Sequence, residues 1–553
     1  MLLIFKKRKY FYSEIYLFLM IMRPLKPFFL SSLLVAVLSS CNSALAPILA
    51  TNPSSIDKTI LKTTPLKEAD LQRWSHLDLL KDTVPGMSVD KAYAEILKGK
   101  KSAKIIVAVV DSGLDIDHED LRGKIWVNKN EIPGNKIDDD KNGFIDDING
   151  WNFLGEATNE NLELTRIVKK GDDGSTTYKN AKAELDQKLS GLMKQKPQVD
   201  MISSADKAIK AYLKKDKYTL SDLKAISSVE PSLVQSKGIM TSIATQAGEN
   251  FQDEIKSYID YIYGQLNYNL NVDFDGRKVV GDNPNDIKDN KYGNANVKGP
   301  NVEDALHGTH VAGIIAQIKN NKKGGDGVVA NNVEIMAVRA VPNGDEYDKD
   351  IALAIRYAVD NGAKVINGSF GKDYSPNKEW VFDAIKYAAS KDVLIVHAAG
   401  NDAKDVDIEP NFPTDEVNGV EIADNLLTIG ALNFECGSNM VADFSNFGSK
   451  NVDVFAPGVK IYATVPNNKY IYEQGTSMAS PNAAGVAALI RSYYPSLTAS
   501  QVKHILMDSG TAITSEVVLG ETKDKKSFAS ASKSGKIVNA YNALVMANKM
   551  TKK

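Results

Sequence analysis

Five short runs of apolar, largely β-branched residues constrain the fold of this chain more than any other feature. The first run, K-I-I-V-A-V-V at 104–110, is apolar at successive positions, as in a strand buried on both faces of a parallel sheet. Helical patterns at 350–361 and 379–390 lie between later runs. This alternation predicts an α/β fold, a mostly parallel sheet with helices on both faces. The other runs lie at 333–340, 364–370, 393–398 and 426–431.

The segment 156–270 interrupts this alternation with a different pattern. Leu185, Leu189 and Leu192 repeat at helical spacing, with charged residues between them. Such stripes indicate amphipathic helices, and the segment contains no catalytic motif. We therefore expect an inserted helical subdomain packed by its apolar stripes, with a substrate-gripping lid as the alternative. A second stripe consists of Phe251, Ile255, Tyr258, Ile259, Ile262 and Leu266.

An apolar run near the N-terminus, F-F-L-S-S-L-L-V-A-V-L at 28–38, ends shortly before Cys41. Its eleven residues are too few for a membrane span, which needs about 20, but they suit the core of a signal peptide. L-S-S-C at 38–41 resembles the bacterial lipobox, whose cysteine is acylated. We expect an exported protein of the bacterial cell envelope, lipid-anchored through Cys41; a plain secretory signal is the alternative. Met22 would make a normal start.

The formal net charge of −2 argues against a nucleic-acid partner, since nucleic-acid binders carry a basic excess. Two cysteines are too few for a disulfide framework. The oligomeric state stays open. The expected organisation is a signal peptide with lipobox at 1–41, a linker at 42–73, an α/β domain at 74–155 and 271–545, the helical insertion at 156–270 and a tail at 546–553.

Three short motifs hold the best candidates for chemistry. V-V-D-S-G-L-D at 109–115 places Asp111 at the end of the first strand, where sites form in open α/β sheets. H-G-T-H-V-A-G at 307–313 opens a helix with His307, and G-T-S-M-A-S-P at 475–481 opens another with Ser477. Taken singly, they could be a turn residue, a helix-start residue and a helix cap.

Together and in this order, the motifs resemble those of the subtilisin-like serine proteases, the peptidase S8 family, for which the order Asp, His, Ser is known. The resemblance covers roughly 74–153 and 271–545. It implies the subtilisin-like fold and serine endopeptidase activity on protein or peptide substrates, without a catalytic cofactor. Further matching stretches are V-I-N-G-S-F-G (365–371), H-A-A-G-N (397–401), D-F-S-N-F-G (443–448) and V-F-A-P-G (454–458).

The resemblance assigns a role to each residue. Ser477 is the nucleophile, and His307, with an ordinary pKa near 6.5, is the base that takes its proton. Asp111 holds the imidazole in the required tautomer. Asn401, with the backbone N–H of the serine, donates to the oxyanion. All four residues are present, which favours an active enzyme over an inactive relative that only binds peptides.

The same resemblance points to a substrate strand. An extended peptide would add to it by backbone pairing, and side-chain preference would come from a pocket floor within 402–416. His397 stands where small apolar residues are common, and its effect stays open. The segments flanking the pocket are Ser369, Phe370 and Gly371, and Ala398, Ala399 and Gly400.

His310 follows His307 by one helical turn, and the H-x-x-H spacing raises the question of zinc. No Glu or third ligand stands nearby in the sequence, so metal catalysis is not expected. The resemblance gives His310 a structural role.

Five aspartates crowd into I-D-D-D-K-N-G-F-I-D-D-I-N-G-W at 137–151. Asp138, Asp140 and Asn142 alternate before Gly143, which is how a chain wraps a hard cation such as Ca²⁺. Asp147 would complete the ligands of a structural calcium site. The EF-hand pattern is incomplete because its twelfth position is an Asn, and a solvated acidic loop is the alternative.

Two further positions are weaker calcium candidates. Asp120 matches a family ligand position, and Asp273 and Asp275 suggest another loop. Because only 70 residues separate Cys41 from Asp111, we also expect acylated Cys41 at the mature N-terminus and no removal of a full-length prodomain.

Overall fold

Strand β1 (Ile105–Asp111) lies inside the sheet, paired in parallel with β3 (Val333–Arg339) on one side and β4 (Val365–Gly368) on the other. Alternate side chains of a strand point to opposite faces. Accordingly, Val107 and Val109 enter one buried apolar cluster, and Ala108 and Val110 enter another. The apolar run therefore contributes side chains to two hydrophobic cores, one on each face of the sheet.

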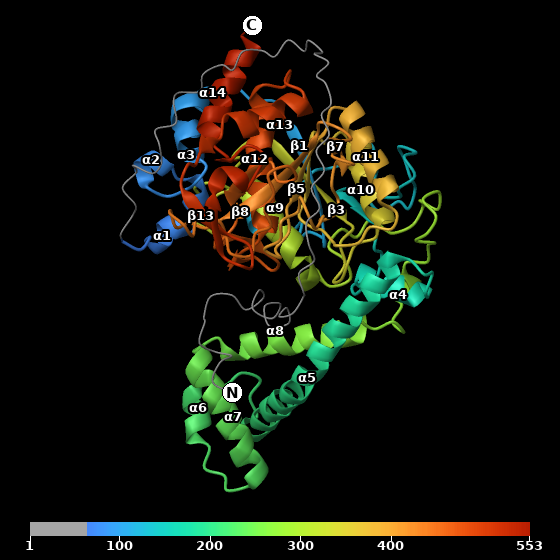
Figure 1. Ribbon diagram of the computed structural model, residues 1–553, viewed down its shortest axis with the longest axis vertical. Coiled ribbons are helices and arrows are strands. Elements are labelled where there is room, and N and C mark those ends of the chain that lie inside the picture. Colours follow the sequence, from blue (N-terminus) through green and yellow to red (C-terminus); the bar gives the residue numbers. More distant parts are fainter. Residues whose placement is uncertain (1–63, 553) are drawn as a thin grey trace, which may run out of the picture.

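The structure, a computed structural model, describes residues 64–552 (Figure 1). Nine strands form the main sheet in the order β12-β15-β9-β8-β5-β4-β1-β3-β2. All neighbours pair in parallel except β12 and β15, so the predicted mostly parallel sheet is confirmed. The remaining strands of this sheet are β2 (Gly150–Asn152), β5 (Leu394–Ala398), β8 (Leu426–Leu432), β9 (Val454–Pro457), β12 (Thr511–Ala512) and β15 (Lys536–Ile537).

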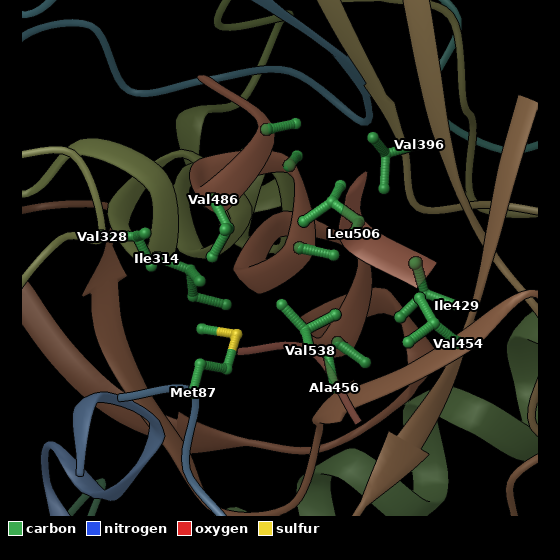
Figure 2. Close-up of a cluster of buried hydrophobic side chains, with 14 of the residues drawn as sticks. Met87, Ile314, Val328, Val396, Ile429, Val454, Ala456, Val486, Leu506 and Val538 are labelled. Carbon is green, nitrogen blue, oxygen red and sulfur yellow. The ribbon is translucent and has the colours of Figure 1, made fainter. Parts of the chain in front are cut away.

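Helices cover both faces of the sheet, as predicted. One face packs against α9 (Leu306–Ala316), α12 (Thr476–Tyr493), α13 (Ala499–Asp508) and α14 (Ala540–Thr551). The other packs against α10 (Asp348–Asp360) and α11 (Lys378–Ser390). Figure 2 shows the first core, where Ile314 and Val486 from helices lie near Val396, Ile429 and Val454 from strands.

Shorter elements complete the α/β domain. Three two-stranded sheets flank it: β6 (Glu416–Val417) with β7 (Val420–Glu421), β10 (Ile461–Val465) with β11 (Lys469–Glu473), and β13 (Glu516–Leu519) with β14 (Asp524–Ser527). The short helices are α1 (Glu68–Leu71), η2 (Trp74–His76), α2 (Leu79–Asp82), α3 (Val89–Ala92), η3 (Tyr93–Leu97), η4 (Glu119–Leu121), η6 (Arg277–Val279), η7 (Val302–Ala305) and η8 (Phe528–Ser530).

The helices predicted within 156–270 are present, and Figure 1 shows α6 and α7 extending well away from the α/β domain. Ser175 starts the long helix by accepting a hydrogen bond from the N–H of Tyr178 (3.0 Å). The apolar stripes form two clusters, one with Leu185 and Ile262 and one with Ile209 and Phe251. The elements are α4 (Glu163–Lys170), α5 (Thr176–Leu213), α6 (Leu220–Ala225), α7 (Pro231–Ala247), α8 (Phe251–Gly264) and η5 (Gln265–Asn269).

No helix formed by residues 64–552 is both long and apolar enough to cross a bilayer. Cys41 and the expected signal peptide lie outside the described residues.

Candidate active site

Asp111, His307 and Ser477 come from three elements that meet at one edge of the sheet. Asp111 is the last residue of β1, and His307 and Ser477 are each the second residue of a helix, α9 and α12. Carboxyl ends of parallel strands lie at a common edge, so helices that start there bring their first residues together.

The imidazole of His307 bonds through Nδ1 to Oδ1 of Asp111 at 2.7 Å. An ionised carboxylate only accepts hydrogen bonds, so Nδ1 carries the proton and Nε2 of neutral His307 is left as the acceptor. Gly308 allows this approach, because a Cβ there would lie 2.0 Å from the backbone oxygen of Gly113. The glycine of the H-G-T-H motif thus lets α9 start against the end of β1.

Three effects act on the pKa of His307. Burial lowers it, whereas the negative charges of Asp111 and Glu473 raise it, and the carboxylates prevail. Glu473 is the last residue of β11, four residues before Ser477. No sequence pattern pointed to Glu473, because its proximity to His307 arises from how the β10–β11 hairpin packs on α9.

The hydroxyl of Ser477 donates to the backbone oxygen of Ser369 at 3.3 Å, and among residues 64–552 it has no hydrogen bond to His307. Hydrogen bonds between catalytic groups are often long or misaligned before substrate binds. A rotation about χ1 of Ser477 would move its hydroxyl away from the Ser369 oxygen and let it donate to another acceptor. The Ser369 hydroxyl in turn donates to the backbone oxygen of Ser477 at 2.9 Å, which fastens α12 to the end of β4.

A buried polar chain supports this junction, and the sequence did not reveal it. Asn367 on β4 donates from Nδ2 to the Ser369 hydroxyl (2.9 Å), and the Ser480 hydroxyl donates to Asn367 Oδ1 (2.8 Å). The start of α12 is therefore held in position by side-chain contacts as well as by apolar packing.

The side chain of Asn401 is oriented by Thr476. Its Oδ1 accepts from the Thr476 N–H (2.8 Å) and hydroxyl (3.0 Å), which leaves the Nδ2 amide as donor. A Cβ placed on Gly475 would lie 3.5 Å from Asn401 Nδ2 and 3.5 Å from the backbone nitrogen of Ser477. The amide nitrogen of Asn401 and the backbone nitrogen of Ser477 thus both lie close to Gly475, as two donors to one oxyanion would have to.

His397 joins the two segments expected to flank the substrate pocket. Its Nε2 donates to the backbone oxygen of Phe370 at 2.8 Å, and burial lowers its pKa to about 4, so the ring is neutral. Ser369, Phe370 and Gly371 directly follow β4 and belong to no strand. Among the other predicted residues, Ala398 and Ala399 are buried and Gly400 is half-buried.

Asn411 lies against both of these segments, the one that ends at Gly371 and the one that contains Ala399. Its Nδ2 donates to the backbone oxygen of Ala399 (3.2 Å), and a Cβ on Gly371 would lie 2.6 Å from that nitrogen and 3.0 Å from Oδ1. Asn411 falls within the stretch 402–416 expected to form the pocket floor. The sequence did not show that one amide, that of Asn411, contacts both segments.

Within residues 64–552, His310 forms hydrogen bonds only to backbone oxygens. Its Nε2 lies 3.1 Å from the oxygen of Ile461 and 3.3 Å from that of Ile471, and burial lowers its pKa to about 3. A neutral, buried ring that links α9 to the β10–β11 hairpin matches the structural role implied for it.

The acidic loop gathers three carboxylates. Oxygens of Glu131, Asp140 and Asp147 lie within 4.8 Å of one another. Asp147 is fully buried, and its pKa is raised to about 6, first by burial and also by Asp140. A set of carboxylate oxygens that repel one another, two of them on buried residues and one on a half-buried residue, fits a hard cation. Sequence reasoning missed Glu131, which precedes the loop.

The other predicted ligands in this loop are placed differently. Asp138 accepts hydrogen bonds from the backbone N–H groups of Asn142 (3.0 Å) and Gly143 (2.8 Å), so it shapes the turn. Asn142 directs its Nδ2 at Asp147 (3.1 Å), while its Oδ1 accepts from the N–H of Phe144 (2.8 Å). In this arrangement Asn142 donates to the cluster.

The weaker calcium candidates differ from each other in burial and in the groups around them. Asp120 is buried, with Oδ1 bonded to the amide of Asn321 and Oδ2 without a hydrogen bond in the described chain; burial raises its pKa to about 6. An orphaned carboxylate oxygen fits a cation. Asp273 and Asp275 are exposed, and the described residues bring no third carboxylate to them.

Comparisons with known proteins agree with this geometry. The model of the subtilase family (Peptidase_S8) matches residues 102–535. The thermophilic serine proteinase of Bacillus sp. (strain AK1) is 41% identical over 221 residues, covering 40% of this chain and 48% of that protein. Subtilisin DY of Bacillus licheniformis is 34% identical over 225 residues, covering 40% of this chain and 76% of that protein.

Among solved structures, proteases from Pseudoalteromonas arctica match with a TM-score of 0.43 and 21% identity, covering 86% of this chain and 97% of the other. The aligned part spans less than half the length of the Bacillus sp. relative.

Proposed function

Because this chain belongs to the subtilase family, we propose that it is a serine endopeptidase with Ser477 as nucleophile, His307 as general base and Asp111 as the partner that orients His307. The single observation that carries the proposal is the 2.7 Å bond between Asp111 and His307 at the sheet edge where Ser477 starts α12. Protein or peptide chains are the substrates.

The reaction follows from these positions. Ser477 attacks the carbonyl carbon of the scissile bond while His307 Nε2 takes the hydroxyl proton. The resulting imidazolium is stabilised by Asp111 and by the negative charge of Glu473. His307 then gives the proton to the leaving amine, and water repeats the sequence on the acyl-enzyme.

The oxyanion of the tetrahedral intermediate takes its hydrogen bonds from Asn401 Nδ2 and the Ser477 N–H, which converge next to Gly475. Thr476 holds the amide before substrate arrives, so little reorganisation is needed in the transition state.

A fluorophosphonate probe tests the proposal on the purified full-length protein. Labelling should occur in the wild type and in Ser496→Ala, an exposed serine after α12, and disappear in Ser477→Ala. If the folded wild type is not labelled and cleaves no peptide, the alternative holds, an inactive peptide-binding lipoprotein.

A structural cation is the second part of the proposal. Glu131, Asp140 and Asp147 would hold Ca²⁺ with oxygen ligands, and its effect would be on stability, since binding to the folded state alone stabilises it. The cluster supports this assignment because its charges repel and one member is fully buried.

The proposed localisation is based on the sequence motif that ends at Cys41. We propose that Cys41 is acylated and anchors the protein in the cell envelope. Metabolic labelling with a fatty acid should mark the wild type, and Cys41→Ser should lose the label and leave the membrane fraction. Membrane retention of an unlabelled Cys41→Ser protein would contradict lipid anchoring.

A further inference from the structure

The segment 369–371, which follows β4, lies between the nucleophile and a buried histidine. The backbone oxygen of Ser369 accepts from the Ser477 hydroxyl (3.3 Å), so this end of the segment borders the catalytic serine. The next carbonyl, that of Phe370, accepts from Nε2 of His397 at 2.8 Å. His397 is 2% exposed, so the Phe370 carbonyl is directed into the protein.

The bond to His397 fixes the orientation of the peptide group between Phe370 and Gly371. In a planar trans peptide the C=O and N–H point in opposite directions, so the Gly371 N–H is directed away from His397. Among residues 64–552 this N–H has no hydrogen-bond acceptor, and Gly371 is exposed. It is therefore a donor to which an extended peptide can add. Glycine restricts its backbone little, so a hydrogen bond is needed to select this orientation.

The imidazole of His397 is also held by packing. His397 pairs with Gly368 in the register of β4 and β5. A Cβ on Gly368 would lie 3.0 Å from Phe370 Cε1 and 3.8 Å from His397 Cδ2, so the glycine makes room for both rings. The Phe370 ring stands edge-on to the imidazole, with ring centroids 5.9 Å apart. The side chain of His397 thus contacts both the ring and the carbonyl of Phe370.

The second nitrogen of this imidazole has no protein partner. The Phe370 oxygen can only accept, so in the neutral ring Nε2 carries the proton and Nδ1 is an acceptor. This Nδ1 is buried and forms no hydrogen bond with residues 64–552. Because buried polar atoms nearly always have a hydrogen-bond partner, Nδ1 points to a ligand that donates to it.

A cavity beside His397 has the size and the polar lining for such a ligand. It is lined by His397 together with Thr414, Thr428 and Asn451, among others. Thr428 on β8 pairs in register with His397 on β5, so the two side chains stand on the same face of the sheet. The cavity leaves about 20 Å³ for the centres of water molecules, and one water needs about 10–15 Å³ on that measure.

We propose that His397 is a positioning residue for the substrate: its Nε2–H fixes the peptide group between Phe370 and Gly371 for pairing with an extended peptide, and a water molecule that bridges its Nδ1 to the Thr428 hydroxyl holds the ring. This inference rests on the proposed function and deepens it, because it concerns how the same site holds the substrate backbone. His397 acts through Phe370, so its effect falls on substrate binding.

Substrates of two lengths test the positioning role on the full-length protein. The informative quantity is the gain in kcat/KM when a single-residue anilide is extended by three residues on its amino side, because only the longer substrate can pair with the segment. His397→Leu removes the donor and should reduce this gain by about 3- to 10-fold, mainly through KM, as expected for one hydrogen bond.

Two further variants are the controls for this measurement. His397→Gln, whose side-chain amide can donate from a position similar to that of Nε2, should keep most of the gain. His504→Leu, the same change at an exposed histidine of α13, should leave the gain unchanged. Should His397→Leu fail to fold, His397→Ala removes the same donor and takes its place. Loss of the gain in His397→Gln as well would show that packing, and not the donor, matters.

Nitrogen-15 NMR of the imidazole tests the water. In the wild type, His397 should show a protonated Nε2 and an unprotonated Nδ1 that accepts a hydrogen bond. Thr428→Val removes the hydroxyl with little change of shape and should move the Nδ1 resonance toward that of a free acceptor. An unchanged resonance would overturn the bridge to Thr428. A protonated Nδ1 in the wild type would overturn the whole inference, because Nε2 could then not donate to Phe370.

Fluorophosphonate labelling separates this inference from the proposed function, because the probe needs no extended peptide. His397→Leu should be labelled at the rate of the wild type. Equal gains from extension in His397→Leu and wild type, with both labelled, would overturn the positioning role and leave the proposed function intact. Absence of labelling in the wild type would overturn the proposed function itself.

Discussion

Asp111 and His307 are 196 residues apart in the chain and are joined by a hydrogen bond of 2.7 Å. The helical insertion accounts for most of that separation, and its ends meet: the N–H of Leu162 donates to the backbone oxygen of Asn269 at 2.9 Å. Closure entropy grows slowly with loop length. A long insertion with its ends tied together therefore leaves the contact between Asp111 and His307 undisturbed.

Asn401→Ala should lower kcat by about 100- to 1,000-fold with little change in KM, because the amide meets negative charge only in the transition state. The range is that measured for the corresponding donor in subtilisin. Steady-state kinetics on a peptide anilide check it, with Ser477→Ala as the zero-activity reference. A raised KM at unchanged kcat would show that Asn401 binds ground-state substrate instead.

Glu473→Gln should move the acid limb of the kcat/KM profile to lower pH. His307 must be neutral to act as base, so activity rises as pH increases through its pKa, and Asp111 and Glu473 hold that pKa above its ordinary 6.5. Removing one of the two negative charges lowers the pKa of His307. Glu119→Gln, a change at a half-buried residue paired with Lys323, is the matched control and should leave the limb in place.

Calcium should raise the melting temperature of the wild type, and chelation should lower it. Binding at a hundredfold excess over Kd stabilises the folded state by about 2.7 kcal/mol. Glu131→Gln combined with Asp140→Asn should abolish this response. Scanning calorimetry distinguishes the alternative: if the loop is only a solvated acidic turn, calcium has no effect and the double variant is more stable, because repulsion is relieved.

Lys372→Met should destabilise the fold strongly. Lys372 is buried among Glu163 and Asp348, and removing one partner of a buried ion pair costs about 3–5 kcal/mol. Urea unfolding measures the change, with Lys182→Met as control, since that exposed pair on α5 contributes about 1 kcal/mol or less. Equal midpoints for the two variants would show that α4 is not fastened through Lys372.

Much of the fold was predictable because it depends on local patterns. The run at 104–110 became β1 (Ile105–Asp111), and the run at 393–398 became β5 (Leu394–Ala398), each shifted by about one residue. Strands buried on both faces need apolar residues at every position, which leaves a strong signal. The helices of the insertion were equally visible from their leucine spacing.

The acidic loop shows the limit of such patterns. Asp138 and Asn142 were expected as ligands from their alternation; backbone N–H groups donate to Asp138 and likewise to Glu131, and the amide nitrogen of Asn142 donates to Asp147. Glu131 joins Asp140 and Asp147 from outside the quoted stretch. A spacing rule describes chain order, whereas a ligand set depends on where side chains converge.

The sequence by itself indicated most element types and, through motifs that resemble a known family, singled out Asp111, His307, Asn401 and Ser477 as candidates, because short motifs at strand ends and helix starts carry that information. Only the tertiary structure decided which distant groups act on them. Glu473 acts on His307 from a hairpin packed on α9, and Glu184 lies beside the segment after Gly371 because Tyr374 donates a hydrogen bond to it. Electrostatic influence falls with distance in space and not along the chain, so no reading of residue order could have paired them.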